Sequence, residues 1–339
     1  MTANQTSPSP HAAGLMQAGM AAVQSGDIDG ALLRFAAARR MTPGDIGLLR
    51  TLAALYQHAG RAAEAWSAAE TGLALLPADP GFAAARIAAL GGAGFADAAL
   101  TLARLQLQDT PEDAALLQHY GNLLLQIGDA AGALQAAETA LVRQPDAPAL
   151  LSIAAEAAFR LGDHGAARAR LDRAITLEPQ NRTLRMARAT MLLSLGEWAQ
   201  GLRDYEYRLQ PDATREIVRH GLALPRWQDE DLRQCHLLVV AEQGVGDQMR
   251  FLRDVIALHP LCGGMTIECA ARLVPLFRRS LPSAVTVVAA EERTDGRRHV
   301  FDYGWLARSG GADSWIEMGS LMLRLLERGV APDRPPEGH

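Results

Sequence analysis

The loop 243–247, with the sequence Gln-Gly-Val-Gly-Asp, is the segment of this chain whose residue types best suit chemistry. It follows an apolar run at 237–241 and precedes a stretch, 248–258, with the spacing of a helix. Its glycines allow a ligand to approach the backbone, and the start of a helix attracts negative charge. The dinucleotide-binding fingerprint lacks its third glycine, because Met249 stands there, and no Gly-Lys-Ser/Thr follows as in a phosphate-binding loop. A tight turn in which Asp247 caps the helix accounts for the same residues equally well.

The other reactive residue types form no site in the sequence. The nine histidines match no standard metal-binding motif, and no Gly-x-Ser-x-Gly nucleophile turn occurs. Cys235, Cys262 and Cys269 are odd in number and lack zinc-binding spacing, so we expect reduced thiols in a cytoplasmic protein. We therefore expect neither a metal nor a cofactor.

A 34-residue period organises the first two-thirds of the chain. Six glycines keep this step, and five prolines keep it too, each 17 residues after a glycine: Gly26, Gly60, Gly94, Gly128, Gly162, Gly196, Pro43, Pro77, Pro111, Pro145 and Pro179. The period predicts stacked pairs of antiparallel helices, in which the glycine turns the chain with φ > 0 and the proline ends the second helix. A small residue also recurs five positions after each glycine, from Ala31 to Gly201. These units resemble tetratricopeptide repeats.

The first helices of such repeats line a concave groove that usually holds an extended segment or a helix of a protein partner. The phase of the family places a set of polar side chains in this groove: Arg50, Gln57, His58, Gln118, Asn122, Gln126, Glu156 and Arg160. For any single one of them, an ordinary solvated position is the favoured interpretation. The set contains one asparagine and no lysine, which excludes a carboxylate-clamp groove of the kind that binds chaperone tails.

Beyond the repeats, the pattern changes to alternating strands and helices. Apolar runs at 237–241, 265–269 and 285–289 alternate with helical stretches at 248–258 and 272–280. This order predicts a parallel sheet. We thus expect an α-solenoid of six repeats forming a right-handed superhelix, followed by a small α/β Rossmann-like domain. The expected parts are a disordered N-terminus (1–11), six repeats (12–45, 46–79, 80–113, 114–147, 148–181, 182–215), a packed connector (216–235), the α/β domain (236–330) and a flexible tail (331–339).

Three motifs around this junction stand in a fixed order: Gly201-x-x-x-Tyr205-Glu206-x-Arg208, then Pro225-x-Trp227, then Glu242-Gln-Gly-x-Gly-Asp247. With looser matches at 301–302 and 315–321, they resemble a bacterial family that joins tetratricopeptide repeats to a glycosyltransferase-like domain. That domain is of the two-Rossmann GT-B type and is related to the heptosyltransferases.

The resemblance implies roles for the residues of the loop. Asp247 would be the general base of an inverting sugar transfer, and Gln243, Gly244 and Gly246 would shape the acceptor side. About 103 residues follow His236, which is room for one half of such an enzyme. The donor-binding half is therefore expected to be missing, and a nucleotide sugar is expected to bind only to a longer form.

Charge and hydropathy restrict the partners. With 33 basic and 38 acidic residues the net charge is −5, which argues against nucleic acid, and no apolar run is long enough to span a membrane. Three hypotheses follow: a scaffold that binds a polypeptide and carries half of a transferase fold, the N-terminal part of a longer nucleotide-sugar-dependent transferase, or a repeat array that the α/β domain merely caps.

Overall fold

The computed structural model describes residues 9–210, 216–242, 244–295, 298–306 and 311–330. Contacts divide the chain into two compact units, Met1–Arg188 (unit one) and Ala189–His339 (unit two). The expected tail 331–339 and most of the expected disordered N-terminus lie outside the described residues. No helix in the described ranges combines the length and the apolar character that crossing a membrane would require.

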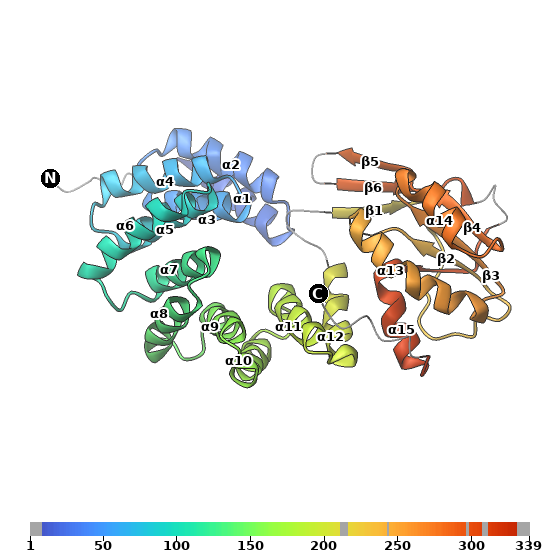
Figure 1. Ribbon diagram of the computed structural model, residues 1–339. Helices are drawn as coiled ribbons and strands as arrows, with labels where there is room; N and C mark the ends of the chain where they lie inside the picture. Colours follow the sequence, from blue (N-terminus) through green and yellow to red (C-terminus); the bar gives the residue numbers. More distant parts are fainter. Residues whose placement is uncertain (1–8, 211–215, 243, 296–297, 307–310, 331–339) are drawn as a thin grey trace. The chain divides into compact units, whose positions relative to one another are not determined.

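Unit one is an array of paired helices (Figure 1). Its helices are α1 (Pro10–Gln24), α2 (Ile28–Met41), α3 (Ile46–His58), α4 (Ala62–Leu75), α5 (Pro80–Gly92), α6 (Ala96–Asp109), α7 (Ala114–Ile127), α8 (Ala130–Arg143), α9 (Pro148–Arg160) and α10 (His164–Leu177). The first helix begins at Pro10, two residues before the expected start. Ser9 caps it by accepting a hydrogen bond from the Ala12 N–H, and proline is tolerated in a first helical turn. A sixth pair follows, α11 (Arg182–Ser194) and α12 (Trp198–Tyr205).

The turns between paired helices confirm the reason for the periodic glycines. All six have positive φ, from 69° at Gly60 to 88° at Gly128. Such a conformation is strained for any residue with a Cβ. At Asp27, Asp129 and Asp163, which follow a turn glycine, the carboxylate accepts a hydrogen bond from the backbone three residues on and caps the second helix.

The recurring small residue lies where the two helices of a repeat approach each other. The alanines at this position, from Ala31 to Ala167, are fully buried at 0% exposure in five successive repeats. The first helices also contact one another in sequence, α3 with α5, α5 with α7 and α7 with α9. They therefore form one continuous layer of unit one.

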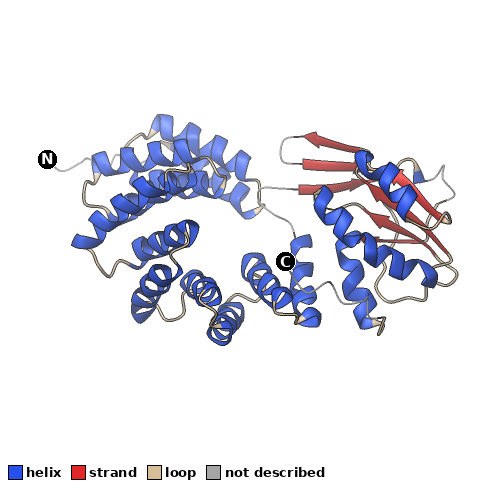
Figure 2. Cartoon of the chain, viewed as in Figure 1, coloured by secondary structure: helices blue, strands red, loops and turns tan. Residues whose placement is uncertain are grey.

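Unit two contains the predicted parallel sheet (Figure 2). Its strand order is β4-β3-β2-β7, and every neighbouring pair is parallel. The strands are β2 (His236–Val240), β3 (Gly264–Cys269), β4 (Val285–Ala289) and β7 (Ser314–Glu317). The helices α13 (Val245–Leu258), α14 (Val274–Ser280) and α15 (Leu321–Glu327) supply apolar side chains to the core on one face of this sheet. The three expected strands are present, and the fourth, β7, was not predicted.

A second sheet lies partly in the stretch that we expected to be a connector. Its order is β1-β6-β5, with β1 (Glu216–His220) parallel to β6 (Arg298–Asp302) and β5 (Glu292–Asp295) antiparallel to β6. The expected connector at 216–235 thus begins with a strand. Its later part pairs beside β7, where the Trp227 N–H donates to the Trp315 carbonyl at 2.7 Å. Trp227 is 1% exposed and belongs to the core of unit two.

Candidate functional site

Three first helices of unit one enclose a small cavity in their shared layer. It measures about 220 Å³ and is lined by Arg50, Ala53, Ala54, Gln57, Gly81, Phe82, Ala84, Ala85, Ala115 and His119, from α3, α5 and α7. Two of the predicted groove residues, Arg50 and Gln57, are among them. The cavity therefore lies along the first helices of three neighbouring repeats.

Half of the eight predicted groove residues brace the repeats. Arg50 forms an ion pair with Asp79, and its guanidinium lies 4.9 Å from the centroid of the Phe82 ring. The Gln57 amide donates to the Ala85 carbonyl at 2.8 Å. These contacts join α3 to α5 and to the turn before it.

A predicted groove residue also joins two first helices at the other end of the layer. Arg160 donates to the Leu125 carbonyl at 2.6 Å and pairs with Glu156 one helical turn away. Arg160 thereby joins α9 to α7. Its charge is shared with Glu156, so neither residue offers an unpaired charge to a partner.

The amides of α7 behave differently. Gln118, Asn122 and Gln126 lie four residues apart, on the helical face that also carries Ala115. Asn122 and Gln126 are exposed and Gln118 is half-buried, and no described residue forms a hydrogen bond with their side chains. His58, also predicted, is likewise exposed and without a described partner. A row of three open amides therefore runs along α7.

The neighbouring helix α5 presents a face of very small residues. Gly81, Ala85, Ala88 and Gly92 follow one another at helical spacing and are exposed or half-buried. At Gly81 the Arg50 guanidinium occupies the space beside the backbone, since it lies 2.5 Å from where a Cβ would be, so Ala85, Ala88 and Gly92 are the small residues of this face that remain. His119 borders the same cavity but was not predicted; burial lowers the pKa of its imidazole, with Asp113 opposing, so the neutral form is favoured.

The glycine loop of unit two opens α13. Gly244 is the N-cap residue of this helix, and no side chain caps it. The alternative in which Asp247 caps the helix is therefore wrong, because its carboxylate sits three residues beyond the cap. Gly244 and Gly246 are exposed, Asp247 is half-buried, and no hydrogen bond to its carboxylate arises from the described residues. Gln243 lies outside the described residues.

A buried ion-pair network lies next to this loop and is centred on Arg208. Its guanidinium binds both oxygens of Glu242, at 2.9 and 2.8 Å, and also Glu206 and Ser320, each at 2.8 Å. The side chains of Arg208 and Glu242 are 2% and 3% exposed. Burial alone would lower the pKa of Arg208, but the charges of Glu242 and Glu206 outweigh it and raise this pKa.

Arg226 extends the network along the sheet. It donates to Glu317 at 2.6 Å and to Glu206 at 3.0 Å, and Ser320 donates to Glu206 at 2.7 Å. Burial alone would raise the pKa of Glu206; Arg208, Ser320 and Arg226 together hold it below its ordinary value. Arg226 was missed by the sequence reasoning, although it stands between the two motif residues Pro225 and Trp227.

The network explains why the three motifs occur together. Glu242 follows β2 and Glu317 ends β7, so both lie at the carboxyl ends of parallel strands. The Gly319 N–H also donates to Glu242, at 2.9 Å. The carboxylates at this edge therefore tie α12 and the 3₁₀ turn after it to the sheet. The Asp247 carboxylate takes no part in these bonds among the residues that the structure describes.

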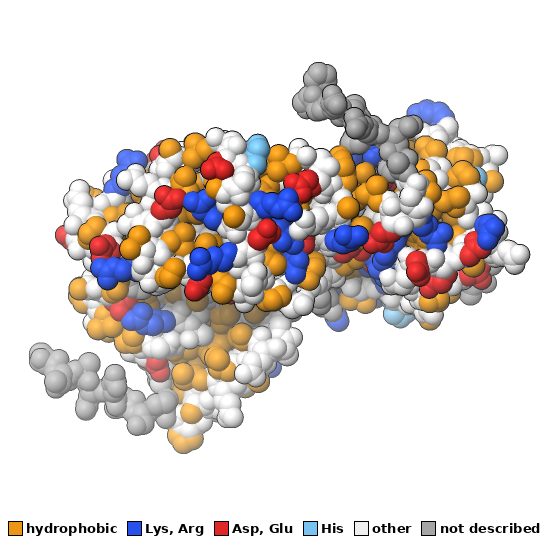
Figure 3. All heavy atoms as spheres, turned by 90° about the horizontal axis from the view of Figure 1, so that it is seen from below, with side chains coloured by type: hydrophobic (Ala, Val, Ile, Leu, Met, Phe, Trp, Pro, Cys, Tyr) orange, Lys and Arg blue, Asp and Glu red, His pale blue; other side chains and the backbone are white. Residues whose placement is uncertain are grey.

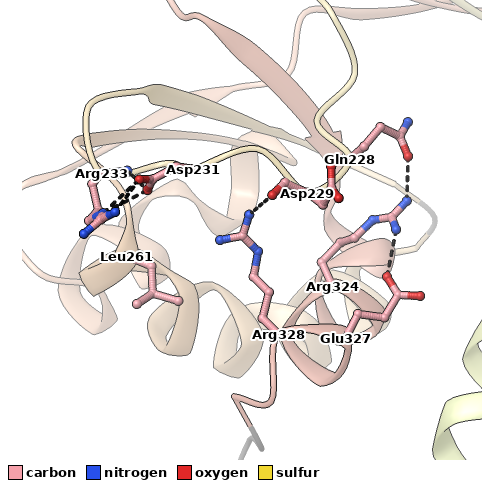
Figure 4. A pocket seen from close by; sticks show the side chains of 8 residues that line it. All are labelled: Gln228, Asp229, Asp231, Arg233, Leu261, Arg324, Glu327 and Arg328. Carbon is pink, nitrogen blue, oxygen red and sulfur yellow. Dashed lines mark hydrogen bonds and ion pairs between the residues drawn. The ribbon is translucent and has the colours of Figure 1, made fainter.

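A larger cavity of unit two is polar (Figure 4). It measures about 810 Å³ and is lined by Gln228, Asp229, Asp231, Arg233, Leu261, Arg324, Glu327 and Arg328. Arg233 pairs with Asp231 at 2.7 Å, and Arg324 binds Glu327 at 2.8 Å. Its arginines are thus occupied by their neighbours. Positively and negatively charged side chains are also mixed on the face shown in Figure 3, where arginines lie beside acidic residues.

The profile of the tetratricopeptide repeat family matches residues 87–148 and 154–215. The helical array consists of tetratricopeptide repeats. Among curated proteins, FlbA of Caulobacter vibrioides is 33% identical over 117 residues, which covers 34% of this chain and 20% of FlbA. The chain thus matches about a fifth of the length of that relative.

Solved structures of other proteins are similar to part of this chain. A chain of the APC/C hetero-tetramer Cut9–Hcn1 is 18% identical with a TM-score of 0.50, covering 57% of this chain and 39% of that one. A thermophilic tetratricopeptide repeat protein of Thermus thermophilus, TTC0263, is 24% identical with a TM-score of 0.47, covering 54% of this chain and 99% of that one. Repeats of this kind are consistent with a scaffold for protein interaction.

Proposed function

We propose that this chain is a scaffold that binds an extended polypeptide in the groove of unit one. The observation that carries the proposal is the row of open amides on α7, Gln118, Asn122 and Gln126, beside the glycine- and alanine-lined face of α5. Each amide offers both a donor and an acceptor, which is what a peptide unit needs. The small side chains of Ala85 and Ala88 would let a main chain come close.

The spacing of the amides matches an extended chain. Residues four apart on a helix are separated by about 6 Å along its axis. Two residues of an extended chain span about 6.6 Å. Successive amides on α7 can therefore pair with every second residue of a peptide that runs along this helix, and the long glutamine side chains absorb the small mismatch. Recognition should depend on the peptide main chain, with the cavity near His119 accepting a side chain.

The test compares two triple variants of the full chain. Peptides are selected against the protein from a random displayed library, and their dissociation constants are measured by fluorescence anisotropy. Replacing Gln118, Asn122 and Gln126 with alanine should weaken binding at least tenfold, since each lost hydrogen bond contributes about 1 kcal/mol. Alanine favours helix, so α7 itself should persist.

The matched control lies on the second helix of the same repeat. Gln135, Thr139 and Val142 are exposed on α8, and their replacement with alanine should leave the affinity unchanged. N-methylation of alternate peptide bonds in a selected peptide should abolish binding, whereas changes to most of its side chains should not. The proposal would be contradicted if both triple variants lost affinity equally, or if the N-methylated peptide still bound.

We propose as a second function that unit two is the acceptor-side half of a glycosyltransferase-like module, which works as an enzyme in a longer form. The observation that favours it is Asp247, whose carboxylate has no hydrogen bond to any described residue and lies in the first turn of α13, after β2. A carboxylate free to accept a proton is what an inverting transfer needs.

Two measurements test the second function. The mass of the protein isolated from its own cells shows whether a longer form exists. In that form, Asp247→Ala should abolish transfer from a nucleotide sugar while the free energy of unfolding changes by less than about 1 kcal/mol, because this residue is not the helix cap. If the native product has the mass of this chain and binds neither UDP-N-acetylglucosamine nor GDP-mannose, the enzyme hypothesis is excluded and the scaffold remains.

A further inference from the structure

Unit two contains a second cavity, of about 580 Å³, which we name the α12–α13 cavity. Its lining residues are Thr190, Leu193, Ser194, Trp198, Leu202, Tyr205, Arg250, Phe251, Arg253, Asp254 and Met322. They come from α12, α13, α15 and the last part of α11, and every lining residue belongs to unit two. Cavities of this size, with mostly apolar walls and a few charged groups, are typical of small-molecule sites.

One of its charged groups is a buried carboxylate without a proper donor. The Asp254 side chain is 2% exposed, and its nearest partner is the Arg253 Nε, 3.5 Å from Oδ1. At that distance and angle no hydrogen bond forms, and both Asp254 Oδ1 and Arg253 Nε are buried without a partner. Burial raises the pKa of Asp254 to about 6, which Arg253 and Arg250 only partly oppose. The Asp254 carboxylate therefore has a cation nearby but no hydrogen bond to its buried Oδ1, which leaves this oxygen able to accept one from a ligand.

Besides Asp254 and Arg253, a third charged residue, Arg250, lines the cavity and lacks a described acceptor. Arg250 lies one helical turn before Asp254 on α13, so both side chains stand on the same face. Arg250 is exposed, and among the described residues no carboxylate or carbonyl accepts a hydrogen bond from it. Its planar guanidinium suits a carboxylate with two acceptor oxygens.

We infer that the α12–α13 cavity binds a zwitterion with an apolar side chain, that is, an apolar α-amino acid. Its ammonium group would donate to Asp254, its carboxylate would accept from Arg250, and its side chain would lie among Trp198, Leu202 and Phe251. Trp198 and Phe251 are half-buried and Leu202 is buried, so an apolar surface is ready without rearrangement of the core.

A ligand with one charge fits the cavity less well. An amine alone leaves Arg250 unpaired and adds a second cation beside Arg253. A carboxylate alone places a negative charge near Asp254 and leaves that group without a donor. A zwitterion satisfies both groups and adds no net charge, which is why the pairing of Asp254 with Arg250 selects it.

The test uses three probes that share one aromatic ring. L-Phenylalanine, 2-phenylethylamine and 3-phenylpropionate are titrated calorimetrically into the full chain. L-Phenylalanine should bind at least tenfold more tightly than either analogue. Asp254→Asn should weaken phenylalanine at least tenfold but leave phenylpropionate binding unchanged or stronger. Arg250→Gln should weaken phenylalanine by a similar factor and leave phenylethylamine binding unchanged or stronger.

The matched control changes an arginine that does not line the α12–α13 cavity. Arg279→Gln, at an exposed position near the end of α14, should change none of these affinities. The inference is overturned if phenylalanine does not bind, if either analogue binds as tightly, or if the Asp254 and Arg250 variants lose all three probes alike. The peptide-binding groove lies in unit one, so failure here leaves that proposal untouched, and the reverse also holds.

Discussion

Arg208→Met gives the sharpest test of the buried network in unit two. The substitution keeps an apolar stem of similar length but removes the cation that binds Glu242 through two hydrogen bonds. The Glu242 carboxylate is 3% exposed and would remain buried without its partner, apart from the Gly319 N–H. Breaking a buried pair in this way costs about 3–5 kcal/mol, because the remaining charge is uncompensated.

The assay is urea unfolding followed by tryptophan fluorescence. Four of the five tryptophans, Trp198, Trp227, Trp305 and Trp315, belong to unit two, so fluorescence reports mainly on this unit. With a urea dependence of about 2 kcal/mol per molar, the fluorescence midpoint should fall by about 2 M. Far-ultraviolet circular dichroism, which is dominated by the helices of unit one, should change much less.

Two further variants separate the causes. Adding Glu242→Leu to Arg208→Met removes the unpaired charge and should restore part of the lost stability. Arg233→Met removes an arginine whose side chain is 82% exposed and pairs with Asp231 at the surface, so its midpoint should match the wild type. If Arg208→Met unfolds at the same urea concentration as Arg233→Met, the network does not hold unit two together and the reasoning is refuted.

Three further predictions concern single positions. Gly128→Ala should lower the free energy of unfolding of unit one by about 1–2 kcal/mol, because the φ of Gly128 is 88°. Gly14→Ala, inside α1 with nothing near its missing Cβ, should instead raise this free energy by up to about 1 kcal/mol. Unfolding followed by circular dichroism measures both, and equal effects would contradict the role of Gly128 in the turn. Asp129→Ala removes the cap of α8 and should lower the free energy of unfolding by about 1 kcal/mol in the same measurement. An unchanged free energy of unfolding would mean that water replaces the carboxylate as the cap. Burial raises the pKa of Asp254 to about 6 from its ordinary 3.8, so its protonation favours the folded state below pH 4 and this contribution is lost as the pH rises through 6. The stability of the wild type relative to Asp254→Asn should therefore fall by about 2 kcal/mol between pH 4 and pH 7 in fluorescence-monitored unfolding, and a constant difference would exclude the raised pKa.

Local sequence signals predicted much of this fold. A turn glycine such as Gly128 is decided by its own backbone conformation, so a fixed period sufficed to place every turn. The strands at 237–241 and 265–269 are buried on both faces, which favours an apolar run, whereas the strand at 285–289 is buried mainly on the face of Val285 and Val287. The strands β1, β5 and β6 were missed because they are short, carry charged residues and are defined by pairing with distant segments.

The candidate sites were only partly predictable for a similar reason. The phase of the repeats places Arg50 and Asn122 alike, yet Arg50 pairs with Asp79 while the Asn122 amide stays open. That difference depends on the neighbouring repeat. Likewise, Arg226 joins Glu206 and Glu317 across 20 and 91 positions of the chain, and no local pattern reveals such contacts.

The most direct test of the central claim is a photocrosslink from the groove. The crosslinker p-benzoylphenylalanine is placed at Asn122 on α7 or at Thr139 on α8, both exposed, and a selected peptide is irradiated with each protein. Peptide binding along the row of amides predicts a covalent adduct from position 122, mapped by mass spectrometry to the peptide main-chain region, and none from position 139. An adduct from position 139, or from neither position while the peptide remains bound, would show that the polypeptide occupies another surface.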